Sequence, residues 1–371
     1  MTVDRLNEFG ETIFATMSAL ATKHNAINLG QGFPDTDGPA KMLQIAQEEI
    51  ANGNNQYSLG MGVQELREAV ADHRLVSVDN VLITVGATEA LTAAVLGNVE
   101  PGQEVIVLEP YYDAYAAAIA LAGAKRVAVP LKQVGNTWDI DVPAIRAAVT
   151  HKTAMIIVNS PHNPTGAVFS RSGLEELAKL CVERDLLVLS DEVYENLVFG
   201  DAKHTRIAEL PGMWLRTISV SSAAKSFNCT GWKTGWAVAS RDLLDGVVKA
   251  KQFMTYVGAT PFQPAVAYAL RHESSWVRDM VADLDRKRQL LADGLRSAGY
   301  RVFDTSGTYF LIADVGQDAI EFCRALPESK GVVAIPLPAF TDHPQQWRNL
   351  VRFAFCKKDE VLQEAVRRLG N

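Results

Sequence analysis

Seven short apolar segments, alternating with stretches of helical pattern, limit the possible folds of this chain more than any other feature. They are VLITV (81–85), EVIVLE (104–109), RVAVPL (126–131), AMIIVN (154–159), LLVLS (186–190), RTISVS (216–221) and GWAVAS (235–240). Strands that are apolar along nearly their whole length are typical of a parallel sheet covered by helices on both faces. We therefore predict an α/β fold around a mostly parallel seven-stranded sheet, with ligands at the carboxyl ends of its strands.

The chain changes character after residue 280. A charged stretch with helical pattern, DLDRKRQLLADGLRSAG (283–299), is followed by short β-rich segments and a closing helical one. With 371 residues the chain is long enough for two domains. We predict a large domain over 46–280 and a smaller α+β domain formed by 1–45 together with 281–371.

Composition narrows the class of protein. The formal net charge of −7 gives no reason to expect nucleic acid or an anionic membrane as a partner. The cysteines lie far apart without a CxxC pair, which argues against a metal site and against disulfides (Cys181, Cys229, Cys323, Cys356). The start, MTVDRLNEFGETIF, lacks the apolar core of a secretory signal, and the run AYAAAIALAGA (114–124) is too short to span a bilayer. We predict a cytoplasmic protein.

The segment SSAAKSFNCTGWKTGW (221–236) follows the sixth apolar run. Lys225 stands there among small residues, and Lys233 follows before a Thr-Gly-Trp turn. The ordinary interpretation is a solvated surface lysine, since most lysines are exposed. The small and apolar neighbours favour instead an amine held at the edge of the sheet.

A phosphate site is indicated where the first strand turns into a helix. Gly86, Ala87 and Thr88 combine free backbone N–H groups at a helix N-terminus with a close approach and a hydroxyl. Ser222 and Lys233 could add a hydroxyl and a cation to the same phosphate. Alone the pattern is weak, because many strand–helix turns contain glycine. No GxGxxG follows a strand, so a dinucleotide site lacks its fingerprint.

Polar and aromatic residues at other strand ends suggest partners for a ring. Asp191 ends an apolar strand, where its carboxylate could pair with a protonated ring nitrogen or cap the next segment. Asn163 lies in SPHNPTG, between Pro161 and Pro164, and could instead form a simple Asx turn. Tyr112 could offer a flat face to a cofactor or serve in packing.

Arg352 stands on the otherwise apolar strand VRFAF. A buried guanidinium requires a planar anion, and either a substrate carboxylate or an internal salt bridge would satisfy it. Taken together, the candidate groups match a phosphate, a ring nitrogen, an aromatic face, a phenolic oxygen, and an aldehyde for Lys225. Pyridoxal phosphate carries all of these groups.

From end to end the chain resembles the fold-type I pyridoxal-phosphate aminotransferases. The resemblance is carried by NLGQGFPD (28–35), NQYS (55–58), ITVGATEA (83–90), EPYYDAY (109–115), SPHNPTGA (160–167), SDEVYE (190–195), SSAAKSFNCTGWKTGW (221–236), GTYFL (307–311), GVVAIP (331–336) and VRFAFCK (351–357). Within this family the chain is similar to the group of kynurenine and glutamine aminotransferases. It looks closest to the actinobacterial N-succinyldiaminopimelate aminotransferases, through SSAAKSFNCTGWK and YVGATPFQPAVA (256–267).

This resemblance implies roles for the catalytic residues. Lys225 would bond the cofactor aldehyde and shuttle the proton, and Asp191 would keep the ring nitrogen protonated. Tyr194 and Asn163 would contact the phenolic oxygen, and Tyr112 would stack on the ring.

The resemblance also implies which residues bind the anionic groups and a second subunit. The phosphate would lie among Gly86, Ala87, Thr88, Ser222 and Lys233. Arg352, Gly32 and Asn163 would receive the substrate carboxylate. Tyr57 would reach the phosphate of the neighbouring subunit in a homodimer with shared sites.

The implied reaction transfers nitrogen between N-succinyl-L,L-2,6-diaminopimelate and 2-oxoglutarate, with glutamate as the natural donor, in the lysine and diaminopimelate pathway. The alternatives within the fold are a kynurenine, glutamine or methionine aminotransferase and a cysteine-conjugate β-lyase.

The sequence departs from the family pattern in two places. The segment LVSVDN (75–80) is shorter than is usual in the family, and Lys233 stands where many members have arginine.

A different class of enzyme, the serine acyl-enzymes, is an alternative interpretation of the same residues. Ser222-Ala-Ala-Lys225 satisfies S-x-x-K and Lys233-Thr-Gly satisfies K-T-G, both features of serine acyl-enzymes such as β-lactamases. The spacing and the order of the third motif do not match, since only Ser190-Asp191-Glu192 resembles S-D-N and it comes first. A pure binding module of the aminotransferase shape could dispense with the lysine, whereas Lys225 is present.

Overall fold

The computed structural model describes residues 3–370 and contains the predicted seven-stranded sheet. Each of the seven apolar segments forms one of its strands, in the order β2-β10-β9-β8-β7-β3-β4. The strands are β2 (Val81–Val85), β3 (Glu104–Glu109), β4 (Lys125–Pro130), β7 (Thr153–Asn159), β8 (Leu187–Asp191), β9 (Thr217–Ser222) and β10 (Thr234–Val238). Only β10 runs antiparallel to its neighbours, so the prediction of a mostly parallel sheet is confirmed.

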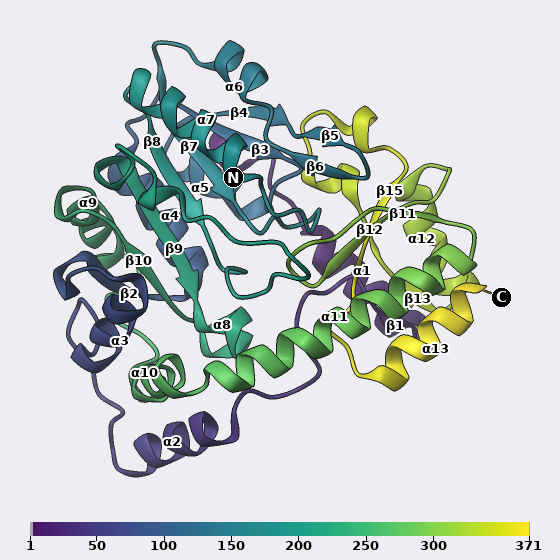
Figure 1. Ribbon diagram of the computed structural model, residues 1–371, viewed down its shortest axis with the longest axis horizontal. Helices are drawn as coiled ribbons and strands as arrows, with labels where there is room; N and C mark the ends of the chain where they lie inside the picture. Colours follow the sequence, from purple (N-terminus) through teal and green to yellow (C-terminus); the bar gives the residue numbers. More distant parts are fainter. Residues whose placement is uncertain (1–2, 371) are drawn as a thin grey trace.

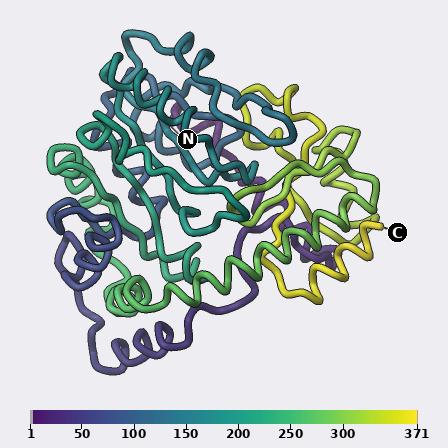
Figure 2. Tube along the Cα trace, viewed as in Figure 1, coloured from purple at the N-terminus to yellow at the C-terminus, as the bar shows by residue number. Residues whose placement is uncertain are grey.

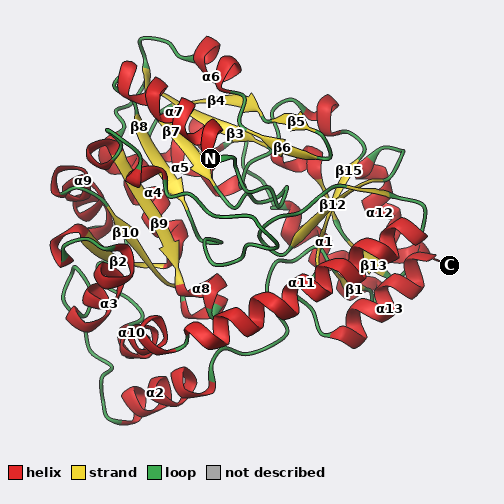
Figure 3. Cartoon of the chain, in the orientation of Figure 1, coloured by secondary structure: helices red, strands yellow, loops and turns green. Residues whose placement is uncertain are grey.

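Helices cover both faces of this sheet (Figures 1 and 3). One face packs against α4 (Gly86–Asn98), α5 (Asp113–Leu121) and α9 (Arg241–Gln252). The other packs against α3 (Gln64–Arg74), α6 (Val142–Ala148), α7 (Arg171–Glu183) and α10 (Gln263–His272). In β3, for example, Val105 and Val107 join one core while Ile106 and Leu108 join the other. Burial on both faces explains why these strands are apolar at almost every position.

A second, smaller layer is built mainly from the C-terminal part of the chain. Its antiparallel sheet has the order β11 (Arg301–Val302), β12 (Phe310–Asp314), β15 (Leu350–Ala354) and β14 (Ile335–Pro336). The N-terminal β1 (Ile27–Asn28) pairs in parallel with β13 (Val332–Val333). Around them pack α1 (Ile13–His24), α12 (Ala319–Ser329), α13 (Asp359–Gly370) and part of α11 (Ser274–Ser297). The two ends of the chain therefore share one core, as their colours show in Figure 2.

The predicted domain borders fall inside two helices. Residues 45 and 46 lie within α2 (Ala40–Ala51), which packs against α10, and residues 280 and 281 lie within the long α11. A further hairpin, β5 (Lys132–Val134) with β6 (Thr137–Asp139), projects beside the large sheet. The division into 46–280 and the rest stays a prediction. Among residues 3–370, no helix is both long enough and apolar enough to cross a membrane.

Helix α3 ends in a tight turn at Leu75. Leu75 adopts a left-handed conformation (φ +56°), and its N–H donates to carbonyls of the last helical turn. The side chain of Arg74 turns inward, where it donates to Glu192 (2.5 Å) and to Glu195 (2.7 Å). Burial raises the pKa of Glu192, but Arg74 and His204 together outweigh this effect and lower the pKa. Arg74 is thus a buried cation in contact with two carboxylates of the SDEVYE turn.

Two glycines allow α4 and α9 to cross at close range. A Cβ atom on Gly97 would lie 2.1 Å from the carbonyl oxygen of Gly246. Gly97→Ala is therefore expected to lower the free energy of unfolding by about 1–3 kcal/mol, because the two backbones must separate. Urea unfolding measures this change. Gly370→Ala in α13, where an added Cβ meets nothing within 4 Å, is the matched control and should leave stability unchanged or slightly raised. Equal effects of the two substitutions would contradict the close crossing.

Candidate active site

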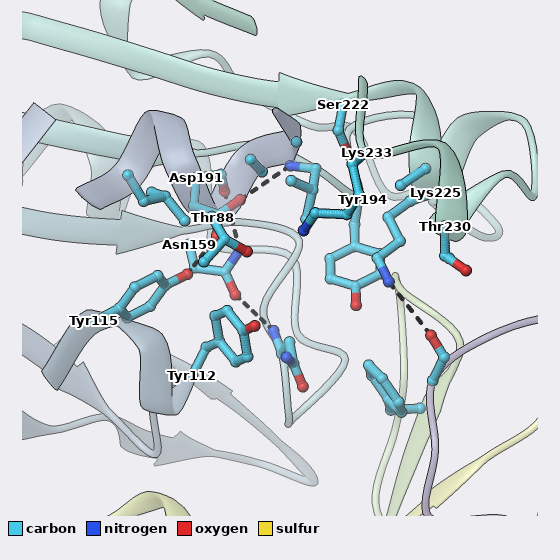
Figure 4. Close-up of a pocket in the computed structure, with 18 of the residues that line it drawn as sticks. Thr88, Tyr112, Tyr115, Asn159, Asp191, Tyr194, Ser222, Lys225, Thr230 and Lys233 are labelled. Atoms are coloured by element: carbon cyan, nitrogen blue, oxygen red, sulfur yellow. Dashed lines mark hydrogen bonds between the residues drawn. The ribbon is translucent and has the colours of Figure 1, made fainter. Parts of the chain in front are cut away.

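A pocket of about 270 Å³ opens at the carboxyl ends of the large sheet, where the smaller layer meets it. Figure 4 shows side chains from several strand ends and helix starts directed toward this one space. Every predicted site residue except Tyr57 lines it, namely Gly32, Gly86, Ala87, Thr88, Tyr112, Asn163, Asp191, Tyr194, Ser222, Lys225, Lys233 and Arg352. Gly32 and Arg352, which are 320 positions apart in the chain (352 − 32), therefore meet in one cavity.

Asp191 is buried at the last position of β8. The Tyr115 hydroxyl donates to its Oδ2 atom (2.5 Å) and the Val193 N–H donates to its Oδ1 atom (3.2 Å). Burial raises the pKa of Asp191 to about 6, and these hydrogen bonds oppose the rise. The segment after Asp191 is a turn and not a helix, so the helix-cap alternative is wrong. Tyr115 was missed, although it lies three residues after Tyr112 and hence on the same side of α5.

Two asparagines connect Asp191 to the opposite wall of the pocket. Asn159 ends β7 beside Asp191, and its amide donates to the Asp191 carbonyl oxygen (3.0 Å). Its Oδ1 atom accepts the backbone N–H of Asn163 (2.8 Å). The Oδ1 atom of Asn163 in turn accepts a hydrogen bond from Arg352 (2.8 Å). The sequence prediction overlooked Asn159, a polar residue at the end of a buried strand.

The proposed phosphate side is shaped by a glycine in a left-handed conformation. Gly86 has φ +71°, and a Cβ on it would lie 3.2 Å from the Lys233 Nζ atom. Lys233 itself is left-handed (φ +52°), which directs its chain toward the first turn of α4. Thr88 lies in that first turn, and Ser222 ends the neighbouring β9. Backbone N–H groups, two hydroxyls and an ammonium therefore face one space, which suits a phosphate.

Lys225 lies in the short helix α8 (Ala223–Ser226), and its amine faces the pocket. Its Nζ atom donates to the Gly32 carbonyl (3.3 Å) and lies 5.8 Å from the ring centre of Tyr194. Burial, with a smaller contribution from the nearby Arg352, lowers the pKa of Lys225 to about 8. The surface-lysine alternative is thus wrong.

Arg352 is a buried cation without a carboxylate partner among residues 3–370. It is 1% exposed and donates to Asn163 Oδ1 (2.8 Å) and to the Gly30 carbonyl (2.7 Å). Its Nε–H has no hydrogen-bond partner in the described chain, and its guanidinium lies 4.0 Å from the ring centre of Phe310. Burial lowers its pKa to about 10, which leaves it charged at neutral pH. Arg352 forms no internal salt bridge within residues 3–370, and a planar anion entering the pocket would satisfy this group.

Tyr57 lies outside the pocket. Its side chain is 82% exposed and contacts the ring of Tyr256 edge-on, at 5.8 Å between ring centres. Leu59, two positions further along the chain, and Phe253 are also exposed, Phe253 by 85%. Within one chain, Tyr57 therefore has no contact with the other predicted site residues that line the cavity.

The family model for class I and II aminotransferases matches residues 24–369, nearly the whole chain. The chain belongs to this family. It is 53% identical to the "Probable N-succinyldiaminopimelate aminotransferase DapC" of Mycobacterium tuberculosis, over 100% of this chain and 98% of that protein. The solved structure of N-succinyldiaminopimelate aminotransferase from the same organism superposes with a TM-score of 0.98 at 53% identity, covering 100% of this chain and 99% of the other. A methionine aminotransferase of Escherichia coli is 37% identical over 98% of this chain and 97% of its own length.

The aminotransferase uses pyridoxal phosphate, and the pocket's chemistry fits this cofactor. The amine of Lys225 can meet an aldehyde, and the buried carboxylate of Asp191 can meet a protonated ring nitrogen. The turn at Gly86 with Lys233 suits the phosphate. No cluster of three or more metal-ligating side chains was found among residues 3–370.

The buried charge of Asp191 gives a direct test of the site. Asp191→Asn keeps the shape but removes the charge that would favour a protonated ring nitrogen, so turnover should fall by about two powers of ten or more. Steady-state kinetics at neutral pH measure it. Asp141→Asn is the matched control, because Asp141 only caps α6 by accepting the Ala144 N–H. If both variants kept full turnover, Asp191 would be a structural residue only.

Proposed function

We propose that the chain is the N-succinyl-L,L-2,6-diaminopimelate:2-oxoglutarate aminotransferase of lysine and diaminopimelate synthesis. The observation that carries the proposal is the 53% identity over the whole chain to the relative of that name, against 37% for the methionine aminotransferase. The TM-score of 0.98 supports it, because a pocket built on nearly the same backbone can hold its side chains in similar places.

The proposed chemistry divides among the residues of the pocket. Pyridoxal phosphate, when bound, supplies the electron sink that makes the Cα–H bond of an amino acid acidic. Asp191 supplies a negative charge for a protonated ring nitrogen, and Tyr112 supplies an aromatic face. Tyr194 and Asn163 supply hydrogen bonds to a phenolic oxygen. Gly86, Ala87, Thr88, Ser222 and Lys233 would hold the phosphate.

Lys225 is the proposed acid and base. With a pKa of about 8, its amine is partly neutral near physiological pH and can both accept and return the Cα proton. Arg352, with Asn163 and the backbone of Gly32, would hold the α-carboxylate of the substrate. The same residues serve the amino-acid donor and the 2-oxo-acid acceptor in turn, and glutamate with 2-oxoglutarate is the proposed nitrogen pair.

The enzyme is proposed to act as a homodimer with shared sites. The exposed aromatic and apolar side chains around Tyr57 support this, because a surface of this kind is commonly covered by another chain. They are Tyr57, Leu59, Phe253, Met254 and Tyr256. Tyr57 of each subunit would then reach the phosphate of the other. The proposed compartment is the cytoplasm, in keeping with four free, buried cysteines.

The role of Lys225 can be tested by replacing it. Lys225→Ala should still bind pyridoxal phosphate through the remaining contacts but should show negligible turnover, because no amine remains to move the proton. In the unchanged protein, borohydride should attach the cofactor to a peptide containing Lys225, as mass spectrometry would detect. Near-normal activity of the variant would remove the central assignment.

The substrate can be tested by comparing acceptors. The succinylated substrate carries two carboxylates beyond the reacting end, whereas kynurenine and methionine present aromatic or apolar ends. A pocket that pairs with distal anions should reject substrates that lack them. We expect catalytic efficiency with the succinylated substrate to exceed that with kynurenine, glutamine or methionine by at least about two powers of ten, or roughly 2.7 kcal/mol.

Arg352→Lys controls this comparison. All of these substrates carry an α-carboxylate, so the substitution should lower every efficiency by a similar factor and leave their ratio unchanged. If the unchanged enzyme had similar catalytic efficiencies with the succinylated and the other substrates, the substrate assignment would be wrong. The assignment as an aminotransferase would still hold.

A further inference from the structure

Tyr309 lies directly behind the pocket and touches residues that line it. Its ring is 1% exposed, and it packs edge-on against Tyr194 at 5.3 Å between ring centres. The Lys225 Nζ atom lies 5.5 Å from the Tyr309 ring centre. The Tyr309 hydroxyl donates a short hydrogen bond to the carbonyl oxygen of Gly32. One buried side chain thus contacts three proposed active-site residues without lining the cavity itself.

The backbone around Tyr309 is fixed by an unusual turn. Thr308, fully buried, has φ +66°, a conformation that costs energy for a β-branched residue. Its N–H donates to the Leu197 carbonyl (2.9 Å), and its Oγ1 atom accepts the Phe310 N–H (3.1 Å). The Tyr309 carbonyl accepts the Phe355 N–H (2.9 Å). Several hydrogen bonds therefore fix the backbone that carries the Tyr309 side chain.

The backbone of Gly32, which carries the accepting carbonyl, is also held in place. A Cβ on Gly32 would lie 2.5 Å from the Phe310 ring and 2.9 Å from the Tyr309 ring, so its backbone rests against both. Its carbonyl oxygen accepts two donors, the Tyr309 hydroxyl and the Lys225 amine. The bond from Lys225 is long, at 3.3 Å. Two donors that share one acceptor oxygen weaken each other, so a carbonyl that already accepts one short hydrogen bond holds a second donor less firmly.

We propose that Tyr309 is a positioning residue for Lys225: its hydroxyl occupies the Gly32 carbonyl and thereby keeps the lysine amine weakly held. A hydrogen bond to an ammonium favours its charged form, so an unshared carbonyl would raise the pKa of Lys225 and leave less of the amine neutral at physiological pH. The inference rests on the proposed role of Lys225 and adds a residue that acts through it.

Other charged groups also face Lys225. Asp191 favours the protonated amine, whereas Arg352 and Lys233 disfavour it. The Cys356 thiol also lies near, but burial raises its pKa to about 11, so it is neutral where Lys225 titrates. Tyr309→Phe leaves these groups and the ring packing in place and removes only the hydroxyl. The Tyr309 hydroxyl also contacts the Tyr194 hydroxyl, but burial raises the pKa of both phenols, so neither titrates near the midpoint of Lys225. The pH midpoint therefore reports the competition for the Gly32 carbonyl.

The test uses the full chain without cofactor and follows pyridoxal phosphate attachment by absorbance over a range of pH. Attachment requires the neutral amine of Lys225, whose pKa is about 8, so its rate should rise with pH through that region. In Tyr309→Phe the midpoint should move upward by about half to one pH unit, which corresponds to about a 3- to 10-fold slower rate below the midpoint. At high pH the two rates should converge.

Tyr111→Phe is the matched control. It also removes a tyrosine hydroxyl with a side-chain partner, Asp342 at 2.6 Å, but Tyr111 does not line the pocket. Its midpoint should equal that of the unchanged protein. A midpoint is independent of the amount of folded protein, so loss of stability in Tyr309→Phe cannot imitate the expected shift.

Two outcomes overturn the inference. If Tyr309→Phe slows attachment equally at every pH, or leaves the midpoint unchanged, Tyr309 serves packing alone. Lys225→Ala separates this failure from that of the proposed function, because it should abolish the absorbance change of covalent attachment. If that change persisted, the role of Lys225 would fail, and the inference with it.

Discussion

The buried carboxylate of Asp191 is the constraint around which the pocket is arranged. Burial raises its pKa to about 6, and hydrogen bonds from Tyr115 and Val193 keep the ionised form accessible at neutral pH. Against this single acid, the described residues lining the pocket include three cations, Lys225, Lys233 and Arg352. A cavity with this excess of positive charge favours anionic ligands. A phosphate and a substrate carboxylate would restore the balance.

The two layers of the molecule contribute different groups to this pocket. The large sheet supplies Asp191 and the turn at Gly86, at strand ends that a parallel arrangement brings to one edge. The smaller layer supplies Arg352, and the segment before α2 supplies Gly32. The site therefore exists only when the two ends of the chain pack together, which the shared core of α1 and the C-terminal strands achieves.

Much of this could be predicted from the sequence, for identifiable reasons. Strands buried on both faces leave long apolar runs, and polar residues at their ends, such as Asp191, mark the ligand edge. Side-chain contacts between distant segments leave no such pattern. The sequence does not reveal that the Tyr115 hydroxyl donates a hydrogen bond to Asp191 or that the Tyr309 hydroxyl donates one to the Gly32 carbonyl. Nor does it reveal that Arg74 donates hydrogen bonds to two glutamates. The role proposed for Tyr57 needs a second chain, and the structure of one chain leaves that residue exposed.

The charges of the pocket also couple substrate binding to proton transfer. Arg352, charged and without an acidic partner among the described residues, lowers the pKa of Lys225. A substrate carboxylate paired with Arg352 would cancel part of that repulsion. The pKa of Lys225 would then rise, because the loss of a neighbouring positive charge favours the protonated amine. Lysine would become a stronger base at the moment when a Cα proton is present to be removed. The absence of an internal salt bridge at Arg352 is thus useful: a permanent carboxylate there would fix the basicity of Lys225 whether or not substrate was bound.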